Sequence, residues 1–138
     1  MHPDNNLPII LASTSRYRRA LLERLGLQFS VSDPGVVETP LPGERPEELA
    51  TRLAYAKAVA VANKHPRSLI IGSDQVAVLG SQILSKPGNY ANAYRQLQQL
   101  SGMTAHFLTA VCVYHTGTGK SLIILILLLI SSISASVL

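Results

Sequence analysis

Residues 13–19 carry hydroxyl and guanidinium groups at a spacing that suits phosphate binding. They read Ser-Thr-Ser-Arg-Tyr-Arg-Arg and follow the apolar run of residues 7–12. The N-terminus of a helix attracts phosphate through its free N–H groups, and arginine side chains bind phosphate oxygens in a bidentate fork. The same segment also fits a capped helix with solvated arginines, because Ser and Thr are common helix caps. Composition leaves both interpretations open.

Asp74 is the acidic residue whose position best suits catalysis. It follows the apolar run of residues 69–71, so we expect it at the end of a buried strand, beside a wall of low dielectric constant. A carboxylate in that position could orient a water molecule or hold a divalent metal ion. The triplet Ser73-Asp74-Gln75 is also typical of a turn in which the aspartate bonds to its own backbone.

The elements that must position these residues alternate along the chain. Apolar runs bounded by turn residues predict strands over residues 7–12, 27–32, 68–72, 76–79 and 104–115. Helical spacing, N-caps and glycine stops predict helices over residues 16–25, 46–64 and 90–100. The alternation of strands and helices predicts an α/β layer architecture.

The composition indicates one domain whose partner is an anion and not a nucleic acid. The 138 residues carry a formal net charge of +4, which suits a nucleotide but is too small and too scattered for a nucleic-acid groove. Five Tyr and two Phe, with no Trp, do not support a base-stacking platform. The single Cys112 excludes an internal disulfide and lies in an apolar run typical of a buried thiol. Residues 1–8 lack a signal-peptide pattern, so we expect a cytoplasmic setting.

Several short motifs occur along the chain in the same order as in one known family of proteins. The opening I-I-L-A-S-T-S-R-Y-R-R-A-L-L-E is similar to the signature with which Maf proteins begin. It is followed by V-E-T-P at residues 37–40, R-L-A-Y-A-K-A at 52–58, I-G-S-D-Q-V at 71–76 and K-P at 86–87, with L-S-G at 100–102. The resemblance to this family, the Maf nucleotide pyrophosphatases, covers residues 7–120 and implies a Maf/ITPase-like mixed sheet flanked by helices.

The resemblance also implies a role for each matching residue in cleaving a nucleoside triphosphate to the monophosphate and pyrophosphate. Asp74 matches the proton acceptor, and Glu38 would be its partner acid. The two carboxylates would hold a divalent cation, Mg²⁺ or Mn²⁺. Ser85 departs from the family, which usually has glycine before the second lysine. The substrate phosphates would be bound by Ser13, Ser15, Arg18, Arg19, Glu38, Lys57 and Lys86, of which the lysines would neutralise developing charge.

Two further residues imply a guanine nucleotide as substrate. Maf proteins that prefer dTTP and UTP usually carry Asp-Thr at the active-site strand, whereas those acting on modified guanine nucleotides carry Asp-Gln, as in Asp74-Gln75. Tyr17 stands where the second group has an aromatic residue, and an aromatic ring can stack on a purine. The chain is therefore similar to the 7-methyl-GTP pyrophosphatases, with dTTP or UTP as the alternative substrate.

Residues 121–138 differ in composition from the rest of the chain. Nine consecutive aliphatic residues, 122–130, precede a serine-rich end. The aliphatic run is about half of the roughly 20 residues that span a bilayer, so a membrane is not the expected partner. We expect a Maf-like domain over residues 1–120 and an aberrant apolar tail over residues 121–138, with the C-terminal part of the family fold missing or replaced through truncation or a shifted reading frame. An unclosed sheet would expose its edges and favour aggregation.

Alternatives to an active enzyme stay open at this point. An inactive remnant or pseudoenzyme of the family would keep the site residues without turnover, and an apolar tail could anchor the chain in a membrane. Gly117-Thr118-Gly119-Lys120-Ser121 resembles the end of a P-loop, but Tyr114 stands where that motif requires glycine. The sequence does not decide whether the chain forms a homodimer.

Overall fold

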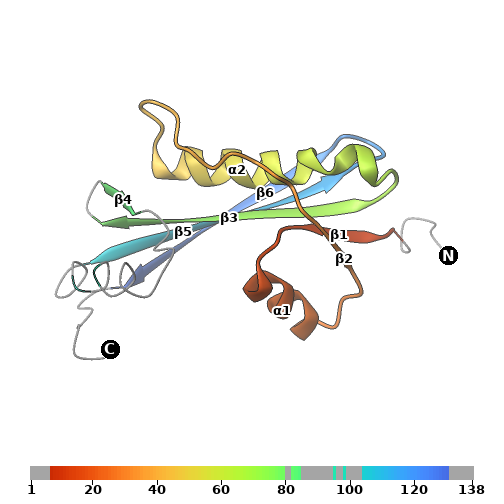
Figure 1. The fold of residues 1–138 in the computed structure, drawn as a ribbon, viewed down its shortest axis with the longest axis horizontal. Helices are drawn as coiled ribbons and strands as arrows, with labels where there is room; N and C mark the ends of the chain where they lie inside the picture. Colours follow the sequence, from red (N-terminus) through yellow and green to blue (C-terminus); the bar gives the residue numbers. More distant parts are fainter. Residues whose placement is uncertain (1–6, 80–81, 85–94, 96–97, 99–103, 131–138) are drawn as a thin grey trace.

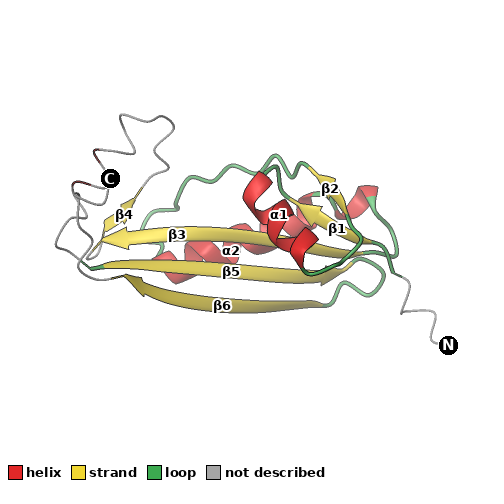
Figure 2. Ribbon diagram, turned by 90° about the horizontal axis from the view of Figure 1, so that it is seen from below, coloured by secondary structure: helices red, strands yellow, loops and turns green. Residues whose placement is uncertain are grey.

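The computed structural model describes residues 7–79, 82–84, 95, 98 and 104–130. They form a mixed sheet with a helix on each face (Figures 1 and 2), which confirms the predicted α/β class. In chain order, the elements are β1 (Ile9–Ala12), α1 (Arg16–Arg24), β2 (Ser30–Ser32), α2 (Pro46–Ala60), the short 3-10 helix η2 (Ala62–Lys64), β3 (Leu69–Leu79), β4 (Gln82–Leu84), β5 (Ala105–His115) and β6 (Ser121–Ile130).

Local sequence sets the ends of both helices. Ser15 caps α1, and its hydroxyl accepts a hydrogen bond from the backbone N–H of Arg18 at 3.2 Å. Gly26 follows the helix with a φ of 74°, a left-handed conformation that glycine adopts without strain. α2 starts at Pro46, followed by two glutamates. Proline needs no hydrogen-bond partner in the first turn, and acidic side chains are favourable at the positive end of the helix.

The sheet has a parallel half and an antiparallel half that meet at β3. The strand order among the described residues is β2-β1-β3-β5-β6, with β4 paired to β3. β1 runs parallel to both β2 and β3, whereas β5 is antiparallel to β3 and β6. The parallel half contains the connections through helices, and the antiparallel half consists of long neighbouring strands, as expected for a mixed sheet.

β3 is one continuous strand, which corrects the prediction of two strand segments flanking a turn at residues 73–75. Each residue from Leu69 to Leu79 lies opposite a residue of β5, from His115 to Ala105. Asp74 therefore lies in the middle of a strand, opposite Ala110, and not at a strand end. The turn prediction was wrong because a polar triplet can stay extended when a neighbouring strand satisfies its backbone groups.

One edge of β3 carries two separate partners. β1 pairs with residues Leu69–Ile71, and β4 pairs with residues Ala77–Leu79. Because β5 occupies the other edge along its whole length, β1 and β4 share this edge. Between β1 and β4, residues 72–76 pair with no strand on this edge among the described residues, although they pair with β5 on the other edge. We call this interval the β3 gap, and Asp74 is at its centre.

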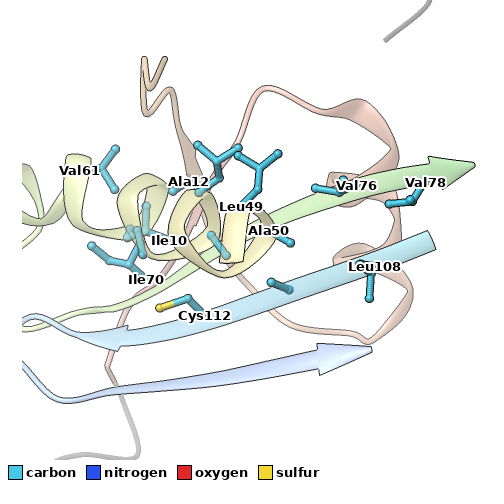
Figure 3. Close-up of a cluster of buried hydrophobic side chains, with 14 residues drawn as sticks. Ile10, Ala12, Leu49, Ala50, Val61, Ile70, Val76, Val78, Leu108 and Cys112 are labelled. Atoms are coloured by element: carbon cyan, nitrogen blue, oxygen red, sulfur yellow. The ribbon is translucent and has the colours of Figure 1, made fainter. Parts of the chain in front are cut away.

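The hydrophobic core lies between α2 and the sheet (Figure 3). The buried side of α2 covers the middle of β3 and β5, while α1 lies on the opposite face, near β1 and β2 (Figures 1 and 2). Burying each large aliphatic side chain contributes about 1.5–3 kcal/mol to folding, so this layer is the main support of α2. Its members include Ile10, Leu49, Leu53, Val61, Ile70, Val76, Val78, Leu108 and Cys112.

Gly72 lets α2 approach β3 closely. A Cβ atom built on this glycine would overlap the carbonyl oxygen of Ala54 and would lie 2.8 Å from the backbone nitrogen of Ala58. Both atoms belong to the backbone of α2, so no side-chain rearrangement could relieve the clash. Glycine at this position therefore sets the distance between the helix and the strand.

The aliphatic residues after the turn form β6, which pairs antiparallel with β5 from Ser121–Tyr114 to Ile130–Ala105. Ile123 packs against the core, but Leu122, Ile124, Ile126 and Leu128 are about half exposed. The sheet thus continues past residue 120, and the division into a domain and a tail at that residue stays a prediction. Within the described part of the chain, no helix is both long and apolar enough to cross a membrane.

Other predicted elements agree with the structure within a few residues, with two exceptions. α2 ends at Ala60 and is continued by η2, where a single helix to residue 64 was predicted. The predicted helix over residues 90–100 falls, apart from residues 95 and 98, outside the described residues. Leu21 and Leu25, in the first predicted helix, are exposed and do not enter the core.

Candidate active site

The centre of the candidate site is the ammonium group of Lys57. Its Nζ atom lies 3.0 Å from Oδ1 of Asp74, 2.7 Å from Oε1 of Glu38 and 3.3 Å from the carbonyl oxygen of Ser73. An ammonium group has three N–H donors, so its hydrogen-bonding capacity matches these three oxygens. The side chains of Lys57 and Asp74 are only 7% and 6% exposed, whereas that of Glu38 is 40% exposed.

Three elements bring this triad together. Lys57 lies on the buried side of α2, Asp74 lies at the β3 gap, and Glu38 belongs to the loop between β2 and α2. Gly72 is two residues before Asp74 and therefore on the same face of β3, beneath α2. The close approach that this glycine allows is what places the lysine within hydrogen-bond distance of the aspartate.

The pKa of Asp74 is raised above its usual value. Burial, which disfavours the charged carboxylate, is the largest cause, and the nearby Glu38 carboxylate acts in the same direction. Lys57 opposes the shift through its hydrogen bond and its charge, and Arg18 opposes it through its charge, but neither overcomes the effect of burial. Asp74 is thus a stronger base than an exposed aspartate would be.

A polar cavity of about 240 Å³ adjoins the triad. It is lined on one side by residues that precede or open α1, namely Ser13, Thr14, Ser15 and Arg18. Residues 33–36, Glu38 and Lys57 line the other side. The hydroxyl of Ser13 accepts a hydrogen bond from the backbone N–H of Ser15 at 3.0 Å, which fixes the turn that leads into the helix. We call this the phosphate cavity, since hydroxyls, a guanidinium, an ammonium and a helix N-terminus converge on it.

A second cavity of about 280 Å³ also borders Glu38. Its polar lining comes from Glu38, Asp74 and Gln75, and its remaining walls are mostly apolar: Pro40, Leu49, Leu53, Val76, Ile83 and Leu84. We call it the apolar cavity. Because the phosphate cavity and the apolar cavity both border Glu38, a ligand with a charged end and a flat apolar end could occupy both.

Several predicted site residues lie together and others do not. The triad consists of Glu38, Lys57 and Asp74. The phosphate cavity beside it is lined by Ser13, Ser15 and Arg18. Arg19 instead forms an exposed ion pair with Glu23, with 3.2 Å between Nε and Oε1. Tyr17 is 74% exposed and lines neither cavity. Lys86 lies outside the described residues.

The side chain of Gln75 lies on the sheet face opposite to that of Asp74. Successive residues of a strand point to opposite faces, and Asp74 faces Lys57 on α2. The Gln75 amide Nε2 donates a hydrogen bond to Oγ1 of Thr109, its neighbour on β5, at 3.1 Å. The role of Gln75 in specificity stays a prediction. Gln75 lines the apolar cavity, but its side-chain amide is already hydrogen-bonded to Thr109.

No motif in the sequence indicated which residues fix the position of the loop that carries Glu38. Arg52 on α2 forms two short hydrogen bonds with the carboxylate of Glu44, at 2.6 and 3.0 Å, and a third with the carbonyl oxygen of Thr39 at 3.2 Å. Arg52 belongs to one of the matched motifs, but its partner is eight residues away across a loop, a spacing that no helix or strand pattern predicts. Asp33 stabilises the start of the same loop, since its Oδ1 accepts a hydrogen bond from the backbone N–H of Gly35 at 3.0 Å.

The carboxylates fit a divalent cation whose coordination is completed by a ligand. Carboxylate oxygens are the ligands that Mg²⁺ and Mn²⁺ prefer, and Mg²⁺ is commonly bound by one or two carboxylates together with substrate phosphates. Asp74 and Glu38 supply two such groups beside the phosphate cavity. Among the described residues, no group of three or more His, Cys, Asp or Glu side chains forms a metal site made by protein alone.

The fold and the site define an α/β protein with paired carboxylates beside a polar cavity lined by hydroxyl and basic side chains, and comparison with known proteins identifies its family. A family model described as "Maf-like protein" matches residues 8–126. The chain belongs to the Maf family, as its motifs predicted.

Curated relatives and one solved structure extend this finding. The 7-methyl-GTP pyrophosphatase of Aromatoleum aromaticum is 54% identical over 81% of this chain and 58% of its own length. That of Nitrosococcus oceani is 51% identical over 82% of this chain and 57% of its own length. The chain therefore spans less than two thirds of these relatives. The Staphylococcus aureus Ham1 protein matches 90% of this chain and 71% of its own chain, with a TM-score of 0.59 and 15% identity, which confirms the predicted ITPase-like fold.

Proposed function

We propose that this chain is a nucleoside triphosphate pyrophosphatase that hydrolyses a modified guanine nucleotide of the 7-methyl-GTP type to the monophosphate and pyrophosphate. The observation that carries the proposal is the buried ammonium of Lys57 between the carboxylates of Asp74 and Glu38, beside a cavity lined by Ser13, Ser15 and Arg18. The names of the curated relatives support the choice of nucleotide.

In this proposal Asp74 takes a proton from the attacking water. The water oxygen bonds to the phosphorus of the α-phosphate, and the bond from that phosphorus to the bridging oxygen breaks, so that pyrophosphate leaves. Asp74 suits this step because burial raises its pKa and makes it a better proton acceptor. Lys57 would stabilise the negative charge that builds on the phosphate oxygens, since a cation acts strongly where water is excluded.

The two cavities suit the two ends of the nucleotide. The triphosphate would lie in the phosphate cavity, where Ser15, Arg18 and the start of α1 offer donors. The base and ribose would extend past Glu38 into the apolar cavity, whose walls of Leu49, Leu53 and Val76 would contact a flat ring. Arg19, Lys86, Tyr17 and Gln75 stay in the proposal as predicted contributors from the family pattern.

The proposal includes a divalent cation, Mg²⁺ or Mn²⁺, held by Glu38 and Asp74 together with the substrate phosphates. When bound, the cation would neutralise phosphate charge and help to orient the reacting groups. Lys57 would then share its two carboxylate partners with the cation. A cytoplasmic setting also stays a prediction.

The test is release of pyrophosphate by the purified chain from 7-methyl-GTP, GTP, dTTP and UTP in the presence of Mg²⁺ or Mn²⁺. We expect 7-methyl-GTP to be preferred and the variant Asp74→Asn to lose activity by about 100- to 10,000-fold, the usual contribution of a general base. Preference for dTTP or UTP would support the alternative specificity. No turnover of any triphosphate by a folded chain would contradict the proposal and favour an inactive member of the family.

A further inference from the structure

The loop that carries Glu38 is folded into a compact turn just after that residue. The backbone N–H of Leu41 donates to Oε1 of Glu44 at 3.0 Å, and the N–H of Glu44 donates to the carbonyl of Leu41 at 3.1 Å. Gly43 completes the turn with a φ of 72°, which a side chain would strain. The carboxylate of Glu44 therefore organises residues 41–44 from within.

Arg52 attaches this turn to α2. Its Nε and Nη2 atoms bind the two oxygens of Glu44 as a fork, at 2.6 and 3.0 Å, and the side chain of Glu44 is only 6% exposed. Nη2 also donates to the carbonyl oxygen of Thr39, the residue directly after Glu38, at 3.2 Å. One guanidinium thus holds both ends of the segment from residue 39 to residue 44. Planar two-point pairing fixes orientation as well as distance, and lysine cannot reproduce it.

The position of Glu38 depends on its loop because its carboxylate meets Lys57 from the solvent side. Glu38 is 40% exposed, whereas Lys57 and Asp74 are buried on elements of the core. Core packing therefore fixes two members of the triad, and something else must fix the third. Arg52 lies on the same helix as Lys57, five residues earlier, so it ties the Glu38 loop to the element that carries the lysine.

We propose that Arg52 is a positioning residue, whose fork to Glu44 and hydrogen bond to Thr39 hold Glu38 over Lys57 and Asp74. The inference rests on the proposed function, since Glu38 is there a cation and phosphate ligand. Arg52 does not line the phosphate cavity, and its hydrogen bonds act on Glu38 through the backbone of the loop. Its charge also acts on Asp74 at a distance, an effect that Arg52→Lys keeps.

The test is a double-mutant cycle between Arg52→Gln and Glu38→Gln, with the affinity of the full chain for Mn²⁺ as the readout. We expect Arg52→Gln to weaken Mn²⁺ binding by about tenfold when Glu38 is present, as residues that orient a metal ligand commonly do. In the Glu38→Gln background, Arg52→Gln should change Mn²⁺ affinity by less than about twofold, because the carboxylate that Arg52 positions is absent. Equal losses in the two backgrounds would mean a general role in stability and would overturn the inference.

Arg45→Gln is the matched control. Arg45 directly precedes α2 and, like Arg52, pairs with a glutamate, with 2.6 Å between its Nε and Oε1 of Glu48, but both of these side chains are largely exposed. We expect it to leave Mn²⁺ affinity unchanged. Should Arg52→Gln fail to fold, Arg52→Lys serves in its place, since it keeps the charge and loses the fork.

Hydrogen exchange of the loop gives a readout that does not depend on the proposed function. Arg52→Gln should speed exchange in residues 39–44, which contain the bonded amides of Leu41 and Glu44, and leave the core side of α2 protected. Unchanged exchange in that segment, or equal acceleration along α2, would overturn the inference. If the wild-type chain binds no Mn²⁺ and cleaves no triphosphate, the proposed function fails, and loop exchange alone then decides the role of Arg52.

Discussion

At the scale of single residues, the site combines a carboxylate that burial penalises with a lysine that needs its carboxylate partners. The pKa of Asp74 is raised because burial outweighs the attraction of Lys57. Lys57 in turn is buried and has oxygen neighbours on Asp74, Glu38 and Ser73. Removing the Asp74 carboxylate and removing the Lys57 ammonium should therefore change stability in opposite directions. The two effects can be measured separately.

Asp74→Asn should inactivate the protein without destabilising it near neutral pH. Because the folded pKa of Asp74 lies above the unfolded one, its contribution to stability is complete below the unfolded pKa and is lost as the pH rises through the folded pKa. Asparagine does not ionise, so the variant escapes this loss, while Lys57 keeps Glu38 at 2.7 Å. Thermal unfolding between acidic and neutral pH should show a Tm at or above that of the wild type, with the difference narrowing as the pH falls. A clearly lower Tm at neutral pH would contradict the assignment.

Lys57→Met should destabilise the fold by about 3 kcal/mol at neutral pH, the lower end for breaking a buried ion pair, because Glu38 keeps part of its hydration. The variant leaves two carboxylates side by side without a counter-charge. The loss should shrink as the pH falls, since protonation removes that repulsion. Urea unfolding at several pH values measures it, and Lys64→Met, which removes an exposed lysine from η2, should change stability by less than about 0.5 kcal/mol. A loss independent of pH would argue against the triad.

Residue types and motif order predicted most of the site, because Asp74, Glu38, Lys57 and Arg18 belong to short matched segments. The sequence did not show to which side of its strand or helix each side chain points. Whether Asp74 and Gln75 point the same way depends on β3 being continuous, which the polar triplet concealed. Tyr17 and Arg19 illustrate the same point, since neither lines the phosphate cavity, whereas Arg18 between them on α1 does. Arg52 was missed because its partners lie on a loop.

At the scale of elements, the separation between α2 and β3 governs the site. Gly72→Ala should cost about 3 kcal/mol of stability, the upper range for overpacking, because its Cβ would meet the backbone of α2 at Ala54 and Ala58. It should also reduce pyrophosphate release, since Lys57 would move away from Asp74. Gly117→Ala is the control, for its Cβ would meet only the end of the His115 side chain in an exposed turn. A Gly72→Ala protein with wild-type stability would show that the helix is free to shift.

The alternation of apolar runs predicted the parallel half of the sheet and its helices well, because turn residues bound each run. The antiparallel half was harder. Residues 122–130 are uniformly aliphatic, so they show neither the period of two of a strand nor the period of a helix. Periodicity therefore does not distinguish a strand from a helix here. Their identity as β6 depends on the neighbouring β5, whose length of eleven residues provides a partner for the whole run.

At the scale of the whole molecule, β6 is the last strand of the sheet among the described residues, and it has no charged residue and exposes aliphatic side chains. Ile124, Ile126 and Leu128 are 50%, 53% and 55% exposed. Edges of this kind pair with other chains unless charge or proline blocks them. We expect self-association that increases with protein concentration, and Ile126→Lys should reduce it, as measured by light scattering. Leu25→Lys removes a more exposed apolar residue from the end of α1 and should have less effect. A wild-type chain that stays monodisperse at high concentration would contradict this prediction.

The register between β3 and β5 also decides which face of β3 carries the side chain of Asp74. A shift of one residue between these strands would turn every side chain of β3 to the other face. Either Ser73 or Gln75 would then lie beneath α2, and Asp74 would face away from Lys57. Gly72 opposes such a shift, since a residue with a side chain in its place would collide with α2, and the Gln75–Thr109 hydrogen bond opposes it from the other face. Correct strand alignment is therefore itself a requirement of the proposed chemistry, and a misaligned chain could be compact yet have no carboxylate of β3 beside Lys57.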